Sequence, residues 1–511
     1  MTGTAGRREW AGLAVLLLPC LLVAMDMSVL FFALPFLSAD LEPTSTQQLW
    51  IADVYGFLLA GLLITMGSIG DRIGRRRLLL IGAGVFGAAS ILTAYAPSAE
   101  WLIVARALLG IGGATLAPST LSLIRNMFHD AKQRTLAISL WTAGFAGGAA
   151  LGPIVGGLLL EHFWWGSVFL INVPAMVLLL VLGPILLPEH VNPNPGRFDV
   201  LSAVLSLAAV LPVINGIKQF AESGVSLAPV VSIVAGVLVG VLFVLRQRTL
   251  SHPMIDLGLF GQREFGAAIG ICVLALFAVM GLSFASAQYL QLVLGMRPFT
   301  AALWSAPTFV GMAIGTTMAA LLARRVRPGF LVAGGMVIAA AGFGLITGID
   351  VDGGLPLLVA GSTAIAVGVG SAIALATDLV VASAPPERAG AASAISETGT
   401  EFGGALGMAV LGSIGVAVYR SGLEDTLPDG VPDAAASAAS DTLGGAMAVA
   451  EGLPAPLGGQ LADAAATAYV SGLHVTVLVG AVVLTCVSVG AALLLRRIPA
   501  SGDSEKMVEP A

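Results

Sequence analysis

The stretch LLVAMDMSVLFFALP, residues 21–35, places one carboxylate, Asp26, within an otherwise apolar run. An acid at the centre of a membrane span costs roughly 2.5 to 3.5 kcal/mol on insertion scales. Five further ionisable residues lie in apolar runs: Asp53, Arg106, Asp378, Glu397 and Glu401. Because charges within a membrane usually mark ion or substrate pathways, these six residues are the first candidates for a function.

Five of the six are acids, so a cavity lined by them would be electronegative and would favour cations over anions. Glu397 and Glu401 are four residues apart and therefore share one helix face. Two carboxylates so close cannot both ionise cheaply, so we expect a coupled pair that exchanges protons near neutral pH. Glu401 is the deeper of the two and the stronger candidate.

The other charges have competing interpretations. Helical rise puts Asp26 about 24 Å from Trp10, beyond mid-membrane, and we expect a water-filled cavity rather than an ion-pair partner to offset its burial. Asp53 is either an interfacial acid beside Trp50 or part of the same cavity. Arg106 is expected to be the buried partner of a carboxylate. Asp378 is expected near the inner end of its span, without a functional role.

Membrane spans must position these residues. The chain has 511 residues, of which 57% are hydrophobic and only 11% charged, against about 25% charged in soluble domains. Fourteen apolar runs are long enough to cross a bilayer. They lie near 11–36, 50–70, 78–97, 101–123, 136–160, 166–187, 199–218, 227–245, 266–290, 301–323, 329–348, 355–382, 391–419 and 470–495.

The basic residues fix the expected orientation. The chain has 24 Lys and Arg residues. If its N-terminus lies in the cytoplasm, only three of them, Lys218, Arg297 and Arg420, fall on the outside or at its boundary. Such a bias predicts a multi-pass plasma-membrane protein with cytoplasmic N- and C-termini. The connection 421–469 has seven acids and no Lys or Arg, and would be extracellular. Its Ala-rich parts, 434–450 and 459–470, are either two short helices against the outer mouth or a surface loop.

The segment GSIGDRIGRRR, residues 67–77, combines small and charged residues at an inner loop. Gly67 permits close approach of helices, and Asp71 can lie against a neighbouring helix N-terminus. The arginines that follow can pair with Asp71 or with other inner loops, which would make a charge latch. The alternative is a topology signal alone. The residues of this inner gate motif are Gly67, Asp71, Arg72, Gly74 and Arg75.

A second motif, GGAALGPIVGG at residues 147–157, places small residues four apart in one helix. Such residues form a smooth face for tight packing, and the proline bends the helix. A bent, closely packed helix suits rocking of two bundles, although ordinary small-residue packing explains the spacing equally well. The residues concerned are Gly148, Gly152, Pro153, Gly156 and Gly157.

The segment 67–77 resembles motif A of the major facilitator superfamily. LIVARALLGIGGA, 102–114, is similar to its motif B, with Arg106 as the charge, and 147–157 is similar to motif C, the antiporter signature. MDMSVLFFALP (25–35), QQLWIADVY (47–55) and WWGSVFLINVP (164–174) resemble the family's 14-span drug:proton antiporters, especially the quaternary ammonium and multidrug exporters of Gram-positive bacteria. The chain lacks an acid in its tenth span, where some of those exporters have one, so export of divalent cations is in doubt.

The resemblance implies an all-α membrane protein with the major facilitator fold, two six-helix bundles plus two extra transmembrane helices. The N-terminal bundle would span 1–187, the linking helices and inner loops 188–265, and the C-terminal bundle 266–511. It also implies a role in proton coupling or cation recognition for an acid in the span of Glu401, and in proton transfer for Arg106.

We therefore expect a monomeric proton-coupled antiporter that exports lipophilic cations by alternating access. Proton and cation would bind at Asp26, Glu401, Glu397, Asp53 and Arg106. The alternatives are an exporter of one antibiotic, a lipid-translocating protein of the same fold, and a sensor or channel. No metal or cofactor site, catalytic cluster or nucleic-acid-binding patch is expected, and the three cysteines fall in apolar runs.

Overall fold

The computed structural model describes residues 5–189, 199–224, 226–250, 253–323, 325–384, 389–496 and 498. These parts of the chain are almost entirely helical, with one isolated β-bridge between Asp350 and Gly353. The longer helices are α1 (Arg7–Leu41), α2 (Ser45–Ile73), α3 (Arg75–Ala94), α4 (Ala99–Met127), α5 (Ala131–His162), α7 (Asn172–Leu186), α8 (Val200–Ser223), α9 (Leu227–Thr249), α10 (Arg263–Gln288), α11 (Pro298–Leu322), α12 (Pro328–Ile346), α13 (Leu355–Ser383), α14 (Ala389–Thr426) and α17 (Leu457–Leu494). The short ones are α6 (Ser167–Leu170), η1 (Leu259–Gly261), η2 (Tyr289–Val293), α15 (Asp433–Asp441) and α16 (Leu443–Gly452).

The prediction of fourteen membrane spans is confirmed within the described residues, with α6 and α7 together forming the sixth. Polar caps place several helix starts. The side chains of Thr44, Ser98 and Asp130 accept hydrogen bonds from backbone N–H groups in the first turns of α2, α4 and α5. Proline in the first turn begins α11, α12 and α13. The helices extend beyond the apolar runs because their ends leave the hydrocarbon and tolerate polar residues.

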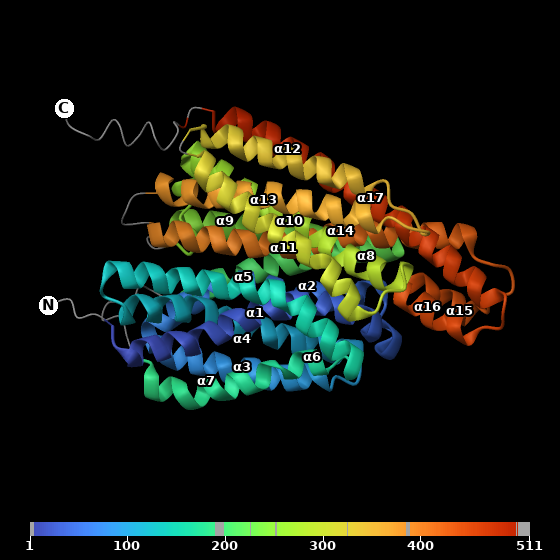
Figure 1. Ribbon diagram of the computed structural model, residues 1–511, viewed down its shortest axis with the longest axis horizontal. Coiled ribbons are helices and arrows are strands. Elements are labelled where there is room, and N and C mark those ends of the chain that lie inside the picture. The colour runs from blue at the N-terminus through green and yellow to red at the C-terminus, as the bar shows by residue number, and fades with distance from the viewer. Residues whose placement is uncertain are drawn as a thin grey trace.

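Figure 1 shows α1 to α7 on one side of the molecule and α10 to α14 with α17 on the other. In the first group α5 packs on α1, and α4 packs on α2 and α3. In the second, α13 packs on α11 and α12, and α14 on α10. The groups meet where α2 packs on α14 and α5 on α11. The pair α8–α9 joins this seam, because α8 contacts both α2 and α14.

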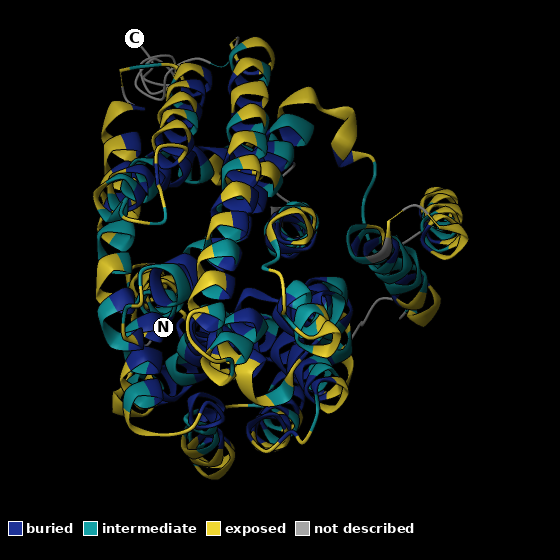
Figure 2. Cartoon of the chain, turned by 90° about the vertical axis from the view of Figure 1, so that its right-hand side faces the viewer, coloured by how far each residue is buried: buried dark blue, intermediate teal, exposed yellow. Residues whose placement is uncertain are grey.

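The outward faces of the helices are apolar. Figure 2 shows exposed residues on the outer sides of the helices and buried residues between them. Helix α9 is an extreme case, since only 11% of its most apolar window is buried. Its exposed residues include Val234, Val237, Leu238 and Val241. A face of this kind is suited to contact with lipid chains.

The segment 427–456 forms a small helical cap at the end of the molecule opposite to the start of α1 (Figure 1). The expected helix 434–450 is instead two, α15 and α16, because Thr442 is extended and its Oγ1 caps α16. The expected helix 459–470 is the beginning of α17. The cap packs on α1 through α16 and is tied down by Arg420 Nη1, 3.2 Å from Asp441 Oδ1. Burial raises the pKa of the Asp441 carboxyl, and Arg420 opposes this.

Candidate functional site

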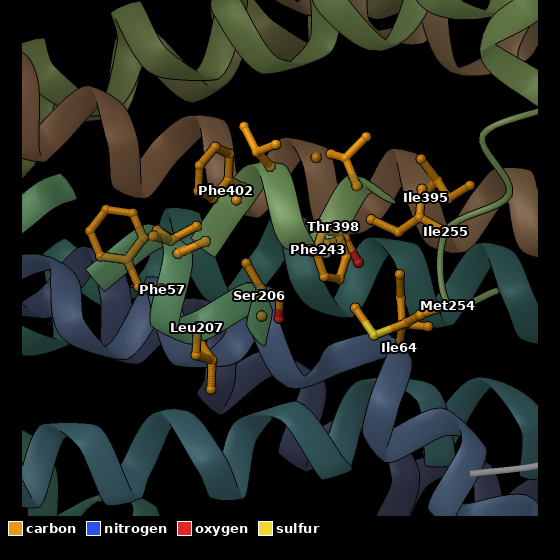
Figure 3. Close-up of a pocket in the computed structure, with 18 of the residues that line it drawn as sticks. Phe57, Ile64, Ser206, Leu207, Phe243, Met254, Ile255, Ile395, Thr398 and Phe402 are labelled. Carbon is orange, nitrogen blue, oxygen red and sulfur yellow. The ribbon is translucent and has the colours of Figure 1, made fainter. Parts of the chain in front are cut away.

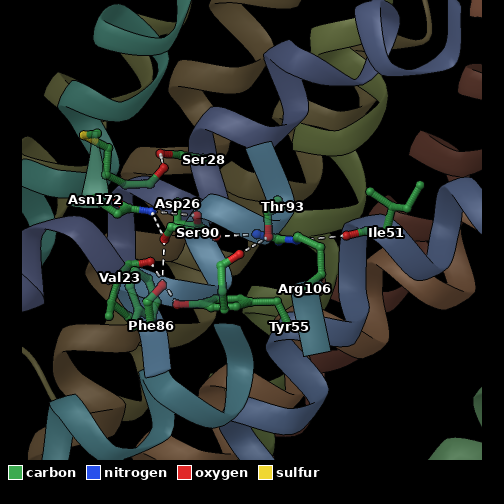
Figure 4. A network of polar contacts seen from close by, with 12 residues as sticks. Val23, Asp26, Ser28, Ile51, Tyr55, Phe86, Ser90, Thr93, Arg106 and Asn172 are labelled. Carbon is green, nitrogen blue, oxygen red and sulfur yellow. Dashed lines mark hydrogen bonds and ion pairs between the residues drawn. The ribbon is translucent and has the colours of Figure 1, made fainter. Parts of the chain in front are cut away.

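The centre of the first helix group contains a buried ion pair between Asp26 of α1 and Arg106 of α4. The Arg106 side chain is fully buried and that of Asp26 is 1% exposed. Arg106 Nε also donates to the carbonyl oxygen of Ile51 at 3.2 Å. Its guanidinium lies over the Tyr55 ring, 4.9 Å from the centroid. Figure 4 shows how these side chains converge from α1, α2 and α4.

Further polar contacts join this pair to α3 and α7 (Figure 4). Asn172 Nδ2 lies 3.3 Å from Asp26 Oδ1 and 3.2 Å from Ser90 Oγ. The Tyr55 hydroxyl donates to the carbonyl oxygen of Val23. Arg106 Nη2 and Asn172 Oδ1 are buried without a hydrogen-bond partner among the described residues. The network therefore keeps unused donor and acceptor capacity at the centre of the bundle.

The expectation for Asp26 is wrong in one respect. A buried ion pair with Arg106, and not a water-filled cavity, compensates its charge, and at 3% exposure Asp26 has no open path to the outside in this structure. The expectation for Arg106 as the partner of a carboxylate is confirmed. Because the pair is fully desolvated, removing either member would strand the other charge in a low-dielectric interior.

A second buried ion pair joins α2 to α8. Lys218 Nζ lies 2.7 Å from Asp53 Oδ1, and both side chains are 0% exposed. The ammonium lies 3.6 Å from the centroid of the Trp50 ring, a cation–π contact. Trp50 Nε1 in turn donates to Asn215 Oδ1 of α8 at 3.4 Å. The first of the two extra spans is thus fastened to the first helix group by a charge pair and an aromatic ring.

These contacts correct the expected set of buried charges. Lys218 is a second buried base, so the set is less acidic than the sequence indicates. Asp53 is fully buried within the protein, and Trp50 lies beside it as a neighbour of its partner. A signal was present in the sequence, since both residues lie one to two turns from the outer end of an apolar run and have opposite charges.

Glu397 and Glu401 of α14 are the least compensated charges of the site. They are half-buried, and neither forms a hydrogen bond or ion pair with any residue that the structure describes. Glu401 interacts electrostatically with Glu397 and with Tyr55 of α2, and Glu397 with Cys20 of α1. Each carboxylate is therefore within electrostatic range of a residue of the first helix group.

Tyr55 is the link between the two charged clusters. The Arg106 guanidinium stacks over its ring, and its hydroxyl interacts electrostatically with the Asp26 and Glu401 carboxylates. The sequence alone did not single out Tyr55 as a candidate. Its place two residues after Asp53, on the helix that faces α14, is the signal that could have identified it. Contacts thus join Asp26, Arg106 and Tyr55, and Glu401 lies within electrostatic range of Tyr55.

Glycines let α14 pack closely on α10 along the face away from its acids. A Cβ on Gly403 or Gly407 would overlap the carbonyl oxygens of Val273 or Phe277 on α10. The two helices therefore pack backbone to backbone along this line. Asp378, by contrast, is exposed near the end of α13, as expected, and the structure does not bring it into the site.

The inner gate motif forms short-range ion pairs at the ends of α2, α3 and α7. Arg75 Nη2 lies 2.5 Å from Asp71 Oδ1, as expected of a latch within the motif. Arg76 Nε lies 3.5 Å from Glu189 Oε2, and its Nη1 donates to the Leu187 carbonyl at 3.0 Å. Glu189, which follows α7, is a member that the sequence reading missed.

The glycines of this motif have different roles. Gly74 has a φ of +107°, and a Cβ there would collide with the Glu189 carboxylate, so its conformation and the space around it both require glycine. Gly67 does not fit the expected close approach, since a Cβ there would lie 3.9 Å from Pro118, an ordinary contact. Arg72 lies next to Asp71 in the last turn of α2.

The helix with the second motif, α5, packs on both groups. Gly148, Gly152 and Gly156 face α1, where a Cβ on Gly148 would overlap the Leu21 carbonyl oxygen and one on Gly152 would lie 3.0 Å from the Met25 carbonyl oxygen. Gly157 faces α11, with Phe299 Cα 2.8 Å from the position of its missing Cβ. Pro153 lies between these contacts. The expected smooth face is confirmed, and it touches the turn of α1 that carries Asp26.

Comparisons with known proteins agree with this architecture. A family model described as Major Facilitator Superfamily matches residues 16–408. The multidrug efflux pump LfrA of Mycolicibacterium smegmatis is 46% identical over 490 residues, which cover 96% of this chain and 97% of that protein. The methyl viologen resistance protein SmvA of Salmonella typhimurium is 34% identical over 470 residues (91% and 93%), and the puromycin resistance protein pur8 of Streptomyces alboniger is 34% identical over 424 (82% and 84%).

Solved structures show the same fold. An inward-facing, unoccupied bacterial homologue of the human lysosomal transporter Spinster superimposes with a TM-score of 0.67 at 16% identity, covering 96% of this chain and 98% of that one. A peptide transporter POT in complex with sulfate gives a TM-score of 0.61 at 17% identity, covering 95% of each chain. The chain is thus a fourteen-span, all-helical transporter that belongs to the major facilitator superfamily.

Proposed function

We propose that this protein is a proton-coupled efflux antiporter that carries lipophilic cations out of the cytoplasm across the plasma membrane. It would act as a monomer with both termini in the cytoplasm, by alternating access between a bundle of residues 1–187 and a bundle of residues 266–511, linked by 188–265. The relatives support export of drugs, since they are named for multidrug efflux and for resistance to methyl viologen and puromycin.

One observation carries the assignment of the coupling site. Glu401 has no ion-pair partner among the described residues, whereas Asp26 is engaged by Arg106 and Asn172. A carboxylate without a fixed counter-charge can hold either a proton or a substrate cation, and the two compete for it. We therefore propose that Glu401, supported by Glu397, carries the exchangeable charge, and that Asp26 and Arg106 position Tyr55 opposite it.

The cycle follows from this competition. From the cytoplasm, a lipophilic cation binds between α1, α2 and α14 and displaces the proton from Glu401. The bundles then rock about the contacts of α5 with α1 and α11, whose glycine faces allow close sliding. On the outside, a proton from the medium neutralises Glu401 and releases the cation. The Asp71–Arg75 and Arg76–Glu189 pairs would break and reform at the inner ends during this motion.

Energetics constrain the stoichiometry. Exchange of one proton for one monovalent cation moves no net charge, so the pH gradient alone drives it, at roughly 1.4 kcal/mol per tenfold ratio of proton concentration. Each additional proton would add roughly 2.3 kcal/mol per 100 mV of membrane potential. Glu397, next to Glu401, is the residue that could carry a second proton.

The test is ethidium efflux from cells that produce the wild type, Glu401→Gln, Asp26→Asn or the control Glu424→Gln. Glu424 lies on the same helix but is exposed beyond the site. We expect Glu401→Gln to lose efflux and Glu424→Gln to retain it. An uncoupler should abolish efflux by the wild type.

In proteoliposomes, a gradient of ethidium should drive proton movement through the wild type but not through Glu401→Gln. Efflux that persists with the uncoupler would overturn proton coupling. Full activity and substrate-driven proton movement in Glu401→Gln would overturn the site assignment. Asp26→Asn should have a lower melting temperature than the wild type as well as reduced efflux. The lower melting temperature would distinguish the positioning role of Asp26 from the proton exchange proposed for Glu401.

A second candidate is export of one specific antibiotic. The puromycin resistance protein of Streptomyces alboniger and the tetracenomycin C resistance and export protein of Streptomyces glaucescens, 31% identical over 490 residues, favour it. A resistance panel with ethidium, a quaternary ammonium compound, puromycin and an uncharged polyketide separates the two proposals. Protection against the cations supports multidrug export, and protection against one neutral compound alone supports the second.

A further inference from the structure

A groove of about 770 Å³ opens at the seam of the molecule and is separate from the acidic site. Its walls come from α2, α8, α9, α10 and α14 and from the loop after α9. Figure 3 shows Phe57 and Phe402 at one end, and Ile64, Met254 and Ile255 towards the other. The volume is in the range of about 300 to 1,000 Å³ that holds drug-sized ligands.

The glutamates of α14 are not among the residues that line the groove. Helix α14 contributes Ile395, Thr398, Gly399 and Phe402 to its wall. With about 100° between successive residues, Glu397 lies nearly opposite the centre of this face, and Glu401 lies about 110° from it. The glutamates interact with α1 and α2 at the centre, whereas the groove is bounded by the peripheral helix α9. The lining of the groove therefore does not include the carboxylates.

The groove is apolar and opens towards the surrounding membrane. Two of the α9 residues in its wall, Val237 and Val241, are 53% and 52% exposed. The α9 residues of the wall run from Val237 to Arg248, about 17 Å at the helical rise per residue. Half of a bilayer's hydrocarbon core is about 15 Å thick. The groove thus has the length of one lipid leaflet.

One charge stands at the end of this groove. Arg248 belongs to the lining, is exposed, and forms no ion pair with any residue in the described parts of the chain. It lies in the last turn of α9, where the chain leaves the membrane on the cytoplasmic side in the proposed orientation. Its neighbour Arg246 is already bound to Asp199, at 2.8 Å from Oδ1. Arg248 would repel a substrate cation and attract an anion at the membrane surface.

We propose that this groove binds one anionic phospholipid of the inner leaflet, with an acyl chain along α9 between α2 and α14 and the phosphate on Arg248. A lipid in this place would seal the inner half of the seam, where α2 and α14 line opposite walls. The inference rests on the proposed orientation, with the inner end of α9 in the cytoplasm. It does not depend on which substrate the protein exports.

The walls of the groove are anchored independently of any ligand. Gln247 Nε2 donates to Ser202 Oγ at 2.7 Å, and its Oε1 accepts from the backbone N–H of Met254 at 2.8 Å. These bonds hold α8, α9 and the following loop together. These contacts do not involve the exposed wall residues Val241 and Val244, which are therefore the positions chosen for substitution.

The test is native mass spectrometry of the full-length, delipidated protein titrated with phosphatidylglycerol or phosphatidylethanolamine. We expect the wild type to bind one phosphatidylglycerol more tightly than phosphatidylethanolamine. Arg248→Gln should weaken phosphatidylglycerol binding about fivefold, the equivalent of about 1 kcal/mol for one basic residue at an anionic surface. It should weaken phosphatidylethanolamine binding less, because the ammonium group of that lipid offsets its phosphate charge. Val241→Trp fills the groove and should weaken binding of both lipids at least tenfold.

Two variants serve as matched controls. Leu238→Trp adds the same side chain to α9 outside the groove, and Arg325→Gln removes an exposed inner arginine elsewhere. Both should bind lipid as the wild type does. If Val241→Trp does not fold, Val244→Trp replaces it, since Val244 also lines the groove and is 39% exposed.

Two results would overturn the proposal. One is a lipid titration in which the wild type binds the two lipids equally, or in which Val241→Trp binds lipid as tightly as Leu238→Trp; either outcome counts as this first result. The other is binding of tetraphenylphosphonium that falls in Val241→Trp and rises in Arg248→Gln, which would assign the groove to a substrate cation. The lipid titration involves no transport, so its outcome is independent of whether Glu401→Gln abolishes efflux.

Discussion

Lys218→Met should destabilise the protein strongly at neutral pH, because it leaves the Asp53 carboxylate buried without its partner. At a separation of 2.7 Å the pair attracts with about 6 kcal/mol for an effective dielectric constant of about 20. Desolvation costs several kcal/mol per ion, so the intact pair adds little net stability. Loss of one member, however, typically costs about 3 to 5 kcal/mol.

Proton uptake sets an upper limit to this cost. A carboxyl group with an ordinary pKa of about 3.9 can be neutralised at pH 7.5 for about 5 kcal/mol, and at pH 5.5 for about 2 kcal/mol. The stability defect of Lys218→Met should therefore shrink as the pH falls from 7.5 to 5.5. The double variant Asp53→Asn/Lys218→Met carries neither charge and should stay within about 1 kcal/mol of the wild type at both pH values.

Thermal unfolding with a thiol-reactive fluorogenic dye measures this in a Cys486→Ser background, since Cys486 is exposed whereas Cys20 and Cys272 are buried free thiols that unfolding exposes. Lys132→Met, which removes an exposed lysine at the start of α5, is the control. An equal melting temperature for Lys218→Met and the wild type at pH 7.5 would refute this prediction. It is also refuted if the defect of Lys218→Met neither shrinks at pH 5.5 nor is rescued by Asp53→Asn.

Two further predictions concern α5 and α8. Gly148→Ala should abolish efflux and lower the stability by about 1 to 3 kcal/mol, because the added methyl group would overlap the Leu21 carbonyl on α1. The control Gly147→Ala has open space around its Cβ and should behave as the wild type in efflux and melting assays. Burial acts to raise the pKa of Asp199, but hydrogen bonds from Arg246 and Ser202 outweigh it and hold that pKa below its ordinary value of 3.8. The resulting stability is present above about pH 3.8 and is lost as the pH falls through the lowered pKa. Melting curves between pH 5 and 3 should show a larger loss of stability for the wild type than for Asp199→Asn, which keeps the helix cap without the charge. Equal losses would contradict this assignment.

The spans were the most predictable part of this structure. A bilayer requires about 20 apolar residues per helix, and the chain meets that requirement fourteen times, so the count followed from length and composition. The glycine face of α5 was predictable as well, because small residues four apart lie on one side of a helix. Both are local properties that one segment carries by itself.

The partners of the buried charges were less predictable, because they depend on which spans pack together. Asp26 and Arg106 are 80 residues apart, and Asp53 and Lys218 are 165 apart. Hydropathy gives the approximate depth of each charge but not the neighbour of its helix. The cap was misjudged for a related reason. Alanine-rich sequence is compatible with helix throughout 434–450, and a single side-chain bond at Thr442 divides it.

The long separation of Asp53 and Lys218 has a consequence for how the protein is made. Ribosomes add roughly 5 to 20 residues per second, so the 165 residues between the two charges take about 8 to 33 s to synthesise. During that interval α2 is inserted while its counter-charge has not yet left the ribosome. The nascent chain must keep Asp53 protonated or in contact with the insertion machinery until α8 arrives. Truncation before residue 218 would leave this acid permanently unpaired, and such a fragment is a natural target for membrane quality control.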